Sequence, residues 1–454
     1  MKKEMKRSAL ITYCLAFFGQ AMLSGLVVTY LMTIYIPTDS SALPILLPNA
    51  ALAFALIRGV GTIIDAVIDL AIASKSDRLQ NKNGRRTPFM RAFFIPWGIC
   101  TALLVFVPVA GTSHWNTAWL AVMLTGYFVF SSLYMVPYIA LSAEIVSKPE
   151  KRVWFYTMQS LFFVVGSMVV YVTPILKNLA MSSGLSELNA WRVAFSFFGV
   201  LGTVCAGISA FTIKEKEYVA AEPSYVPMLP AIRATFRYRH YTIFTLGSLF
   251  LQFALVFFNS ALMYYITMLI GAPESFSLIS MSLTIIVGIA TYPLVNLLAK
   301  KWGKKPLLLF ACAVYIAVYA VIYFYNIFIP VLGSILSCLL VGVAIGFPIS
   351  ITNIIPGTIY ADMAQYDAIL TNDNKEAMFS AARSFVLQFG YSGVLMIIPL
   401  IISWQSTDGR ATVEGVRATA ILALAMVAVA LVFFSFYDDR KIQKVIKEHV
   451  EMNG

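Results

Sequence analysis

The chain has 454 residues, of which 59% are hydrophobic and only 12% are charged, and its mean hydropathy is +0.80. A soluble domain carries about 25% charged residues, so this composition excludes a soluble globular protein and predicts an all-α integral membrane protein. The formal net charge of +11 is accounted for below by the loops between the membrane spans, and we expect no nucleic-acid partner.

Twelve segments are long and apolar enough to cross a bilayer, which takes roughly 20 residues of helix. The first follows the basic stretch MKKEMKRS and has no small-residue cleavage site, so we expect a retained helix and not a removed signal peptide. In chain order the expected spans are 9–36, 46–73, 92–110, 117–143, 154–176, 190–212, 241–270, 277–299, 306–326, 329–351, 377–403 and 412–437.

Basic residues divide unevenly between the two sets of loops. Of the 33 Lys and Arg residues, 28 lie in the N-terminus, the C-terminal tail and every second loop, and four lie in the opposite loops. Because cytoplasmic loops are enriched in Lys and Arg, this split predicts that both termini are cytoplasmic. We expect a multi-pass protein of the plasma membrane, which is the inner membrane of a bacterial cell.

The longest expected cytoplasmic loop, 213–240, divides the chain into six spans plus six. The loop after the second span contains SKSDRLQNKNGRRTP, and the loop after the eighth contains AKKWGKKP; both are basic, contain Gly and end in Pro. Such matching positions are expected of transporters built from two related halves. We therefore predict an N-terminal bundle at 1–212, a linker at 213–240, a C-terminal bundle at 241–437 and a cytoplasmic tail at 438–454.

The second expected span carries charges that a lipid-facing helix would exclude. Its segment RGVGTIIDAVIDLAIASKSDR begins at Arg58 and includes Asp65 and Asp69. At about 100° per residue, Asp65 lies about 20° short of two turns from Arg58, and Asp69 lies about 20° past three turns. The three charges form one stripe about 16 Å long, with Thr62 about 40° to the side. Charged residues in a span face the bundle interior or a water-filled cavity.

Two of these residues also admit structural roles. Asp69 is close to Lys75 in sequence, so it could lie near the cytoplasmic interface and hold loops together. Arg58 lies near the middle of the span, where it is either a structural partner for the two carboxylates or a contact for an anionic group on the solute. Direct pairing with Asp69 is not expected, because about 16 Å of helix separates the two residues.

The segment DAVIDLAIASKSDRLQNKNGRRTPF resembles the second-span signature of the glycoside-pentoside-hexuronide:cation symporters, the melibiose-permease group of the major facilitator superfamily. Three further stretches resemble that family in order: YMVPYIALSAEIVSKPEKR (134–152), ALMYYITMLIG (261–271) and YADMAQYDAILTNDNKEAMFSAARSF (360–385). The resemblance covers nearly the whole chain. It implies the major facilitator fold, with twelve transmembrane helices in two six-helix bundles.

The resemblance also implies a cation site made by Asp65, Asp69 and a hydroxyl of the fourth span, which is Ser132 by alignment on Pro137. A monovalent cation is the expected partner. A carboxylate pair suits Na⁺, a hard ion that prefers oxygen ligands, and it can also share a proton because two like charges raise one pKa. No cofactor is expected beyond the coupling ion, H⁺ or Na⁺. Ile68 replaces the amide of Na⁺-using relatives, which favours H⁺.

The sequence departs from the family at its charged sugar-binding positions. By motif spacing these positions are Ala21, Met135, Gln159 and Gln388, and none carries a charge here. Amide and aromatic side chains remain, and each either contacts substrate or bonds helices to one another. With Arg58, the candidate substrate-binding residues are Gln20, Tyr134, Met135, Gln159, Asn259, Tyr264 and Gln388.

Charged residues at the expected cytoplasmic ends of the spans are candidates for gating. Asp77, Arg78 and Arg85 belong to the basic loop that, in proteins the chain resembles, steadies the inward-closed state. Asp362 and Arg383 flank the connection between the tenth and eleventh spans, where salt bridges of a loop or gate are expected in preference to a substrate contact.

The leading interpretation is a cation-coupled symporter that moves a glycoside or similar small organic solute by alternating access, as a monomer in the lipid bilayer. Within transporters, an amphipathic, lipid-like or anionic solute is the alternative, because the sugar-binding charges are missing. An uncoupled facilitator or a sensor on the same fold is a further alternative, which the retained aspartates disfavour. A membrane-embedded enzyme is disfavoured, because the five cysteines lie in apolar segments and the three histidines are scattered, so no reactive cluster or metal site is predicted.

Overall fold

The computed structural model describes residues 5–78, 84–146, 149–213, 215–218, 238–371, 376–406, 408–439, 441–445 and 448. Among these residues every regular element is a helix and none is a strand. The chain forms two compact units, Met1–Ser224 with Leu395–Thr412, and Tyr225–Val394 with Val413–Gly454. The first division falls inside the predicted linker, whereas residues 395–412 group with the first unit and not with the bundle predicted to contain them.

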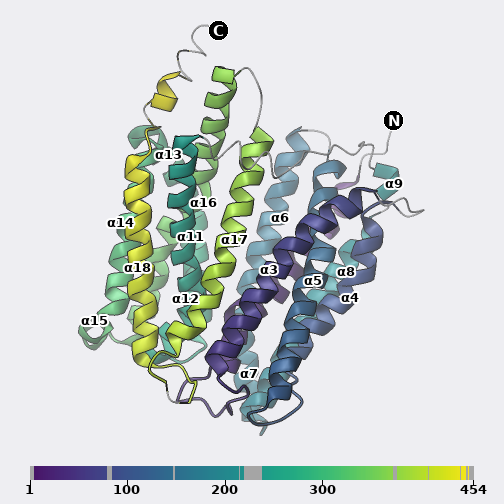
Figure 1. The fold of residues 1–454 in the computed structure, drawn as a ribbon, viewed down its shortest axis with the longest axis vertical. Helices are drawn as coiled ribbons and strands as arrows, with labels where there is room; N and C mark the ends of the chain where they lie inside the picture. The colour runs from purple at the N-terminus through teal and green to yellow at the C-terminus, as the bar shows by residue number, and fades with distance from the viewer. Residues whose placement is uncertain are drawn as a thin grey trace. The chain divides into compact units, whose positions relative to one another are not determined.

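The first unit is built from long helices that pack side by side (Figure 1). Its first span is one nearly continuous helix with a π-turn inside it. Its fifth span ends at Val170, and a separate short helix with Pro174 in its first turn begins at Thr173. The elements are α1 (Arg7–Gly25), η1 (Leu26–Tyr30), α2 (Leu31–Tyr35), α3 (Ala50–Arg78), α4 (Thr87–Leu103), α5 (His114–Ile145), α6 (Pro149–Val170), α7 (Thr173–Ser182), α8 (Glu187–Thr212) and α9 (Glu215–Tyr218).

The second unit has the same kind of architecture. Its first span also ends in a π-turn, and its second is bent by 50° at the junction of two helices. The elements are α11 (Arg239–Tyr264), η2 (Tyr265–Leu269), α12 (Phe276–Ala290), α13 (Tyr292–Trp302), α14 (Lys304–Tyr323), α15 (Tyr325–Leu332), α16 (Ser334–Thr371), α17 (Glu376–Ile402), whose last turns group with the first unit, and α18 (Val413–Phe436).

Helix pairing inside the first unit repeats inside the second. In the first, α1 packs on α8, α3 on α5, and α4 on both α5 and α8. Counting six spans further along the chain, α11 packs on α18, α12 on α16, and α14 on both α16 and α18. Four helix pairs therefore correspond between the two halves, which extends the weak repeat that the loop sequences indicate, and α1 packs in addition on α6 in the first half.

Small residues allow the closest of these contacts. A Cβ built on Gly19 of α1 would lie 2.5 Å from the Gly202 carbonyl oxygen of α8, and one built on Gly342 of α16 would lie 2.5 Å from the Ser280 carbonyl oxygen of α12. Both distances are shorter than a carbon and an oxygen tolerate. Membrane helices approach this closely only where a small residue removes the side chain from the interface.

The predicted spans coincide with helices, but some of their ends do not. Nine helices of the described residues, or ten if the bent α12–α13 pair is one span, are long and apolar enough to cross a membrane. The prediction 92–110 was displaced, because α4 begins at Thr87 and ends at Leu103. The prediction 329–351 was short, because α16 continues through polar residues to Thr371. The all-helical membrane fold is confirmed, and the count of twelve stays a prediction.

Candidate functional site

Helix α3 has two faces of opposite character. One face exposes Leu52, Leu56, Val60, Ile63 and Val67, each between 43% and 62% exposed. The charged stripe lies on the other side, since Asp65 is about 140° around the helix from Val60. Arg58 is only 3% exposed and the two aspartates are half-buried. The stripe therefore points into the first unit, as the helical spacing predicts.

The fourth-span hydroxyl meets the first carboxylate of this stripe. Ser132 lies on α5, which packs along α3, and its Oγ donates a hydrogen bond of 2.5 Å to Asp65 Oδ1. Ser132 is 4% exposed. Asp69 follows Asp65 by one turn of the same helix, so three oxygen-bearing side chains lie on neighbouring positions of two packed helices. The structure thus brings Asp65 and Ser132 together, and their role in binding a cation stays a prediction.

Arg58 is held by backbone and by an aromatic ring. Its Nη1 donates to the Val27 carbonyl oxygen at 3.3 Å, and its Cζ lies 6.0 Å from the centre of the Phe54 ring. Val27 belongs to the π-turn η1. Where a helix changes from hydrogen bonds four residues apart to bonds five residues apart, a backbone carbonyl oxygen loses its usual N–H donor and can accept a bond from a side chain. Thr62 Oγ1 donates back to the carbonyls of Arg58 and Gly59, at 3.2 and 2.9 Å. Neither the Val27 carbonyl nor the Phe54 ring is one of the two carboxylates, so both predicted roles of Arg58, as their partner and as a contact for an anionic group, stay predictions.

Three predicted substrate residues of the first unit lie in its packed interior. Tyr134 is fully buried, and its hydroxyl donates to the Ala206 carbonyl oxygen of α8 at 2.7 Å. Gln159 is 3% exposed, and its Nε2 donates to the Tyr138 hydroxyl and to Ser142 Oγ, both at 3.0 Å. Met135 is 6% exposed. Bonding between helices describes Tyr134 and Gln159 better than substrate contact, because their donors are already used.

Gln20 differs from these residues. It is half-buried on α1, and its Oε1 is a buried acceptor with no hydrogen-bond partner among the described residues. A buried amide oxygen without a donor is costly. Gln20 therefore has an acceptor that the described residues leave unsatisfied, and its contact with a solute stays a prediction.

The predicted residues of the second unit have mixed surroundings. Asn259 is half-buried, and its Nδ2 donates to the Leu255 carbonyl oxygen one turn earlier on α11, at 2.9 Å. Tyr264 is fully buried at the end of α11, beside the π-turn η2. Gln388 is exposed on α17. Their contact with a substrate stays a prediction.

The basic loop of the first unit is organised by two glutamates that sequence reasoning assigned no role. Glu215 accepts hydrogen bonds of 2.9 Å from the backbone N–H groups of Arg85, Arg86 and Thr87 and from Thr87 Oγ1. It therefore caps the start of α4, where a carboxylate is stabilised by the unsatisfied N–H groups and the helix dipole.

Glu144, at the end of α5, binds the side chains of the same loop. Its oxygens lie 2.9 Å from Arg86 Nη1 and 3.5 Å from Arg85 Nη2. Arg85 thus contacts Glu144 through its side chain and Glu215 through its backbone N–H, and its role in gating stays a prediction. The side chains of Asp77 and Arg78, also predicted for gating, lie outside the described part of α3.

In the second unit the two predicted gating residues have separate partners. Asp362 Oδ2 lies 2.5 Å from Lys304 Nζ at the start of α14 and accepts a bond of 2.6 Å from Gln443 Nε2. Arg383 lies over the Tyr360 ring, with its Cζ 4.8 Å from the ring centre. Asp362 thus joins α16 to α14 and to the C-terminal tail. The sequence alone does not indicate whether Asp362 pairs with Lys304 or with Arg383, since both basic residues lie near span ends.

The described residues contain no group of three or more His, Cys, Asp or Glu placed to hold a metal ion, and all five cysteines are free and buried. The polar side chains at the predicted site of the first unit are therefore carboxylates, hydroxyls, amides and the guanidinium of Arg58. Such groups can bind a monovalent cation and a polar solute.

Comparisons with known proteins agree with this arrangement. The family model described as MFS/sugar transport protein matches residues 9–438. The chain is 22% identical over 370 residues to the inner membrane symporter YicJ of Escherichia coli (strain K12), covering 80% of this chain and 77% of that protein. It is also 22% identical over 470 residues to the lactose permease of Lactobacillus helveticus, covering 96% and 71%.

Solved transporters share the fold at low sequence identity. The nucleoside transporter NupG superposes with a TM-score of 0.67 at 12% identity, covering 96% of this chain and 100% of that chain. The D-xylose–proton symporter gives a TM-score of 0.61 at 15% identity, covering 94% and 96%. With a family match over nearly its whole length, the chain belongs to the MFS/sugar transport family and is a multi-pass membrane transporter, not an enzyme.

Proposed function

We propose that this transporter is a cation-coupled symporter that moves a glycoside or a similar small organic solute by alternating access. The observation that carries the proposal is the hydrogen bond between Ser132 and Asp65, on a face of α3 that points into the protein. An intramembrane carboxylate is costly to keep and marks an ion or substrate pathway. Asp69, one turn further along α3, completes the proposed site.

Among coupling ions we favour the proton. Ile68 stands between the two aspartates, where an amide oxygen would add a ligand for Na⁺. Hard metal cations require several oxygen ligands, whereas a proton requires one carboxylate. Uptake driven by an Na⁺ gradient at clamped pH, without a response to a proton gradient, would reverse this choice.

The test is uptake by the purified protein in proteoliposomes, with lactose, D-xylose and uridine as the first panel. These solutes follow the names of similar transporters and not a property of this chain. For the solute that is taken up, Asp65→Asn should abolish accumulation against a gradient while exchange of labelled for unlabelled solute continues. Ser132→Ala should weaken accumulation less, because it removes a neutral donor and not a charge.

The matched control is Asp39→Asn, since Asp39 is an exposed carboxylate outside α3. It should leave accumulation unchanged. Accumulation that survives in Asp65→Asn and Asp69→Asn alike would refute coupling through these carboxylates. If the protein neither accumulates nor exchanges any of the three solutes, none of them is its substrate.

An amphipathic solute is the second candidate, and the surroundings of Tyr134 and Gln159 favour it. Their polar atoms are bonded within the protein, so the first unit offers a sugar fewer groups than its sequence suggests. A thermal-shift comparison of lactose with lysophosphatidylcholine below its micellar concentration distinguishes the two classes. Stabilisation by lactose alone would argue against the amphipathic solute.

The proposed orientation places both termini in the cytoplasm of a cell whose plasma membrane holds the protein. Ser113 precedes α5 in a segment poor in Lys and Arg, and Lys301 lies in the basic last turn of α13. The five native cysteines are buried, so background labelling of the Ser113→Cys and Lys301→Cys variants should be low. A membrane-impermeant maleimide added to intact cells should label the first variant and spare the second. Equal labelling of both would contradict the proposed orientation.

A further inference from the structure

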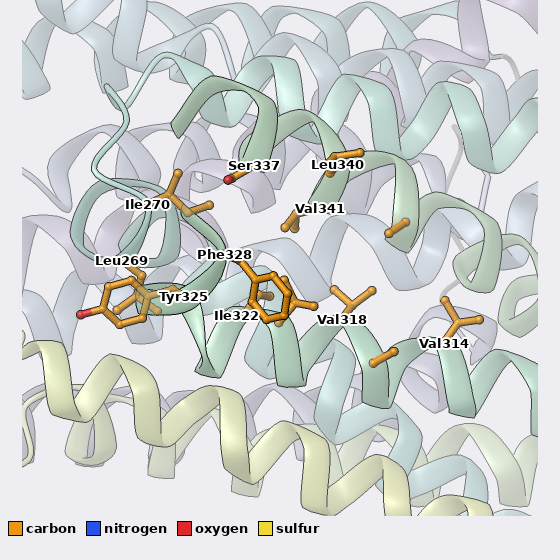
Figure 2. A pocket seen from close by; sticks show the side chains of 13 residues that line it. Leu269, Ile270, Val314, Val318, Ile322, Tyr325, Phe328, Ser337, Leu340 and Val341 are labelled. Atoms are coloured by element: carbon orange, nitrogen blue, oxygen red, sulfur yellow. The ribbon is translucent and has the colours of Figure 1, made fainter. Parts of the chain in front are cut away.

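An apolar cavity of about 380 Å³ lies in the second unit between α14 and α16. This volume is within the range of about 300–1,000 Å³ typical of ligand pockets. Figure 2 shows the side chains of Val314, Val318 and Ile322 along one side and those of Leu340 and Val341 along another. Tyr325 and Ser337 are the two lining residues with a hydroxyl, and Ser337 Oγ donates to the Gly333 carbonyl oxygen, so the cavity suits a hydrocarbon chain.

The cavity opens toward the surroundings of the protein. Three of its lining residues, Val321, Phe328 and Leu340, are 36%, 39% and 45% exposed. Both α14 and α16 are long and apolar enough to span a membrane, so the open side faces lipid acyl chains. From Val314 to Ile322 the lining extends about 12 Å along α14, which is most of the depth of one leaflet in a hydrocarbon core of about 30 Å.

An ion pair, Arg417 with Glu414, lies next to Tyr325 at one end of the cavity, outside its lining. Tyr325 lines the cavity beside Leu269 and Ile270 (Figure 2). The Cζ of Arg417 lies 5.9 Å from the Tyr325 ring centre and 4.9 Å from that of Tyr323. Tyrosine rings are enriched at the membrane–water boundary, so this end of the cavity has the composition of a headgroup region.

The ion pair presents charges of both signs. Arg417 Nη1 lies 3.4 Å from Glu414 Oε2, and the two side chains are 26% and 58% exposed. A purely anionic headgroup would be attracted by Arg417 and repelled by Glu414. A headgroup with a phosphate and an ammonium group can satisfy both, because residues at i and i+3 on a helix are about 5–6 Å apart and the ethanolamine link is similarly short.

We propose that this cavity holds one acyl chain of a bilayer phosphatidylethanolamine, with the phosphate bound by Arg417 and the ammonium group by Glu414. The lipid is a resident partner of the second unit and is separate from the transported solute. Its site shares no residue with the proposed cation site, so the failure of either proposal leaves the other standing.

The test uses the full-length protein in nanodiscs that contain phosphatidylethanolamine with a diazirine near the end of one acyl chain. After photolysis, digestion and mass spectrometry should locate the label in residues 314–344. Val341→Trp fills the cavity and should reduce this label at least fivefold. Val343→Trp is the matched control, since Val343 is 43% exposed two residues along the same helix and does not line the cavity.

The headgroup is tested with phosphatidylglycerol carrying the same diazirine. Arg417→Gln should reduce labelling by both lipids, and Glu414→Gln should remove the preference for phosphatidylethanolamine over phosphatidylglycerol. If Val341→Trp alters the elution profile of the protein, Ala344→Leu replaces it as a milder filling variant. Equal labelling of wild type, the filling variant and Val343→Trp would mean that only annular lipid was captured, and would overturn the proposal.

Discussion

The contact between Glu215 and the start of α4 makes a strong prediction about stability. Glu215 is 2% exposed and accepts four hydrogen bonds, three of them from backbone N–H groups at the beginning of the helix. A hydrogen bond to a charged group contributes about 1.5–3 kcal/mol, and a carboxylate at a helix N-terminus adds up to about 2 kcal/mol. In the variant, water can satisfy some of the N–H groups that Glu215 leaves. We therefore expect Glu215→Ala to lower the free energy of unfolding by about 3 kcal/mol.

For a unit of this size, 3 kcal/mol corresponds to a fall of about 6 °C or more in Tm. The assay is a thermal melt of detergent-solubilised protein followed by fluorescence size-exclusion chromatography. Glu215→Gln should lose less, because one oxygen acceptor remains. Glu217→Ala is the matched control, since Glu217 is exposed on the same short helix. Equal melting of Glu215→Ala and Glu217→Ala would refute the capping role.

Gly84 provides a second test of the contact between Glu215 and the start of α4. It has φ +112°, and a Cβ built on it would lie 2.2 Å from Glu215 Oε2. Gly84→Ala should therefore destabilise the protein through both backbone strain and displacement of the carboxylate. In a double-mutant cycle the two losses should not add, because Gly84→Ala clashes with a side chain that Glu215→Ala removes. Additive losses would show that the loop relaxes independently of Glu215.

Two further predictions concern packing inside the first unit. Gly19→Ala should lower Tm by the equivalent of about 1–3 kcal/mol, because its Cβ would lie 2.5 Å from the Gly202 carbonyl oxygen. Its control is Gly393→Ala in the second unit, which should leave Tm unchanged because nothing lies within 4 Å of that Cβ. At the buried pair of Lys177 and Glu187, Glu187→Leu should cost more than Lys177→Met in the same melts. The reason is that Glu187 also accepts hydrogen bonds from the Ser41 hydroxyl and the Ala42 backbone N–H. Equal losses of stability in the two variants would contradict this reasoning.

Hydropathy and charge were sufficient to predict the class of fold. The lengths of the apolar runs indicate the helices because a bilayer imposes about 20 apolar residues on each span. They do not indicate where a helix ends once it leaves the hydrocarbon. For this reason α16 continues well past its predicted end, and α4 begins before its predicted start, at the point where Glu215 supplies a cap.

The candidate site was predictable where it depends on one helix and less so where it depends on several. The spacing of Arg58, Asp65 and Asp69 predicts a single stripe, and the exposed face of α3 confirms that the stripe points inward. Tyr134 and Gln159 could not be assigned in this way. Whether a buried hydroxyl or amide faces a solute or a neighbouring carbonyl depends on which groups the adjacent helices present, and the sequence of one span does not contain that information.

The repeated arrangement also separates what the fold contributes from what the side chains contribute. Each half has a π-turn in its first span, at η1 and at η2. In the first half that turn supplies the Val27 carbonyl to Arg58 and so anchors the helix that carries the aspartates. In the second half Tyr265 of η2 hydrogen-bonds Thr419 at 2.9 Å. The first contact uses a backbone carbonyl of the π-turn and the second uses a side-chain hydroxyl, so the two turns have the same backbone form and different partners. Since the proposed cation site lies wholly on α3 and α5, substitutions that remove cation binding should fall in the first half.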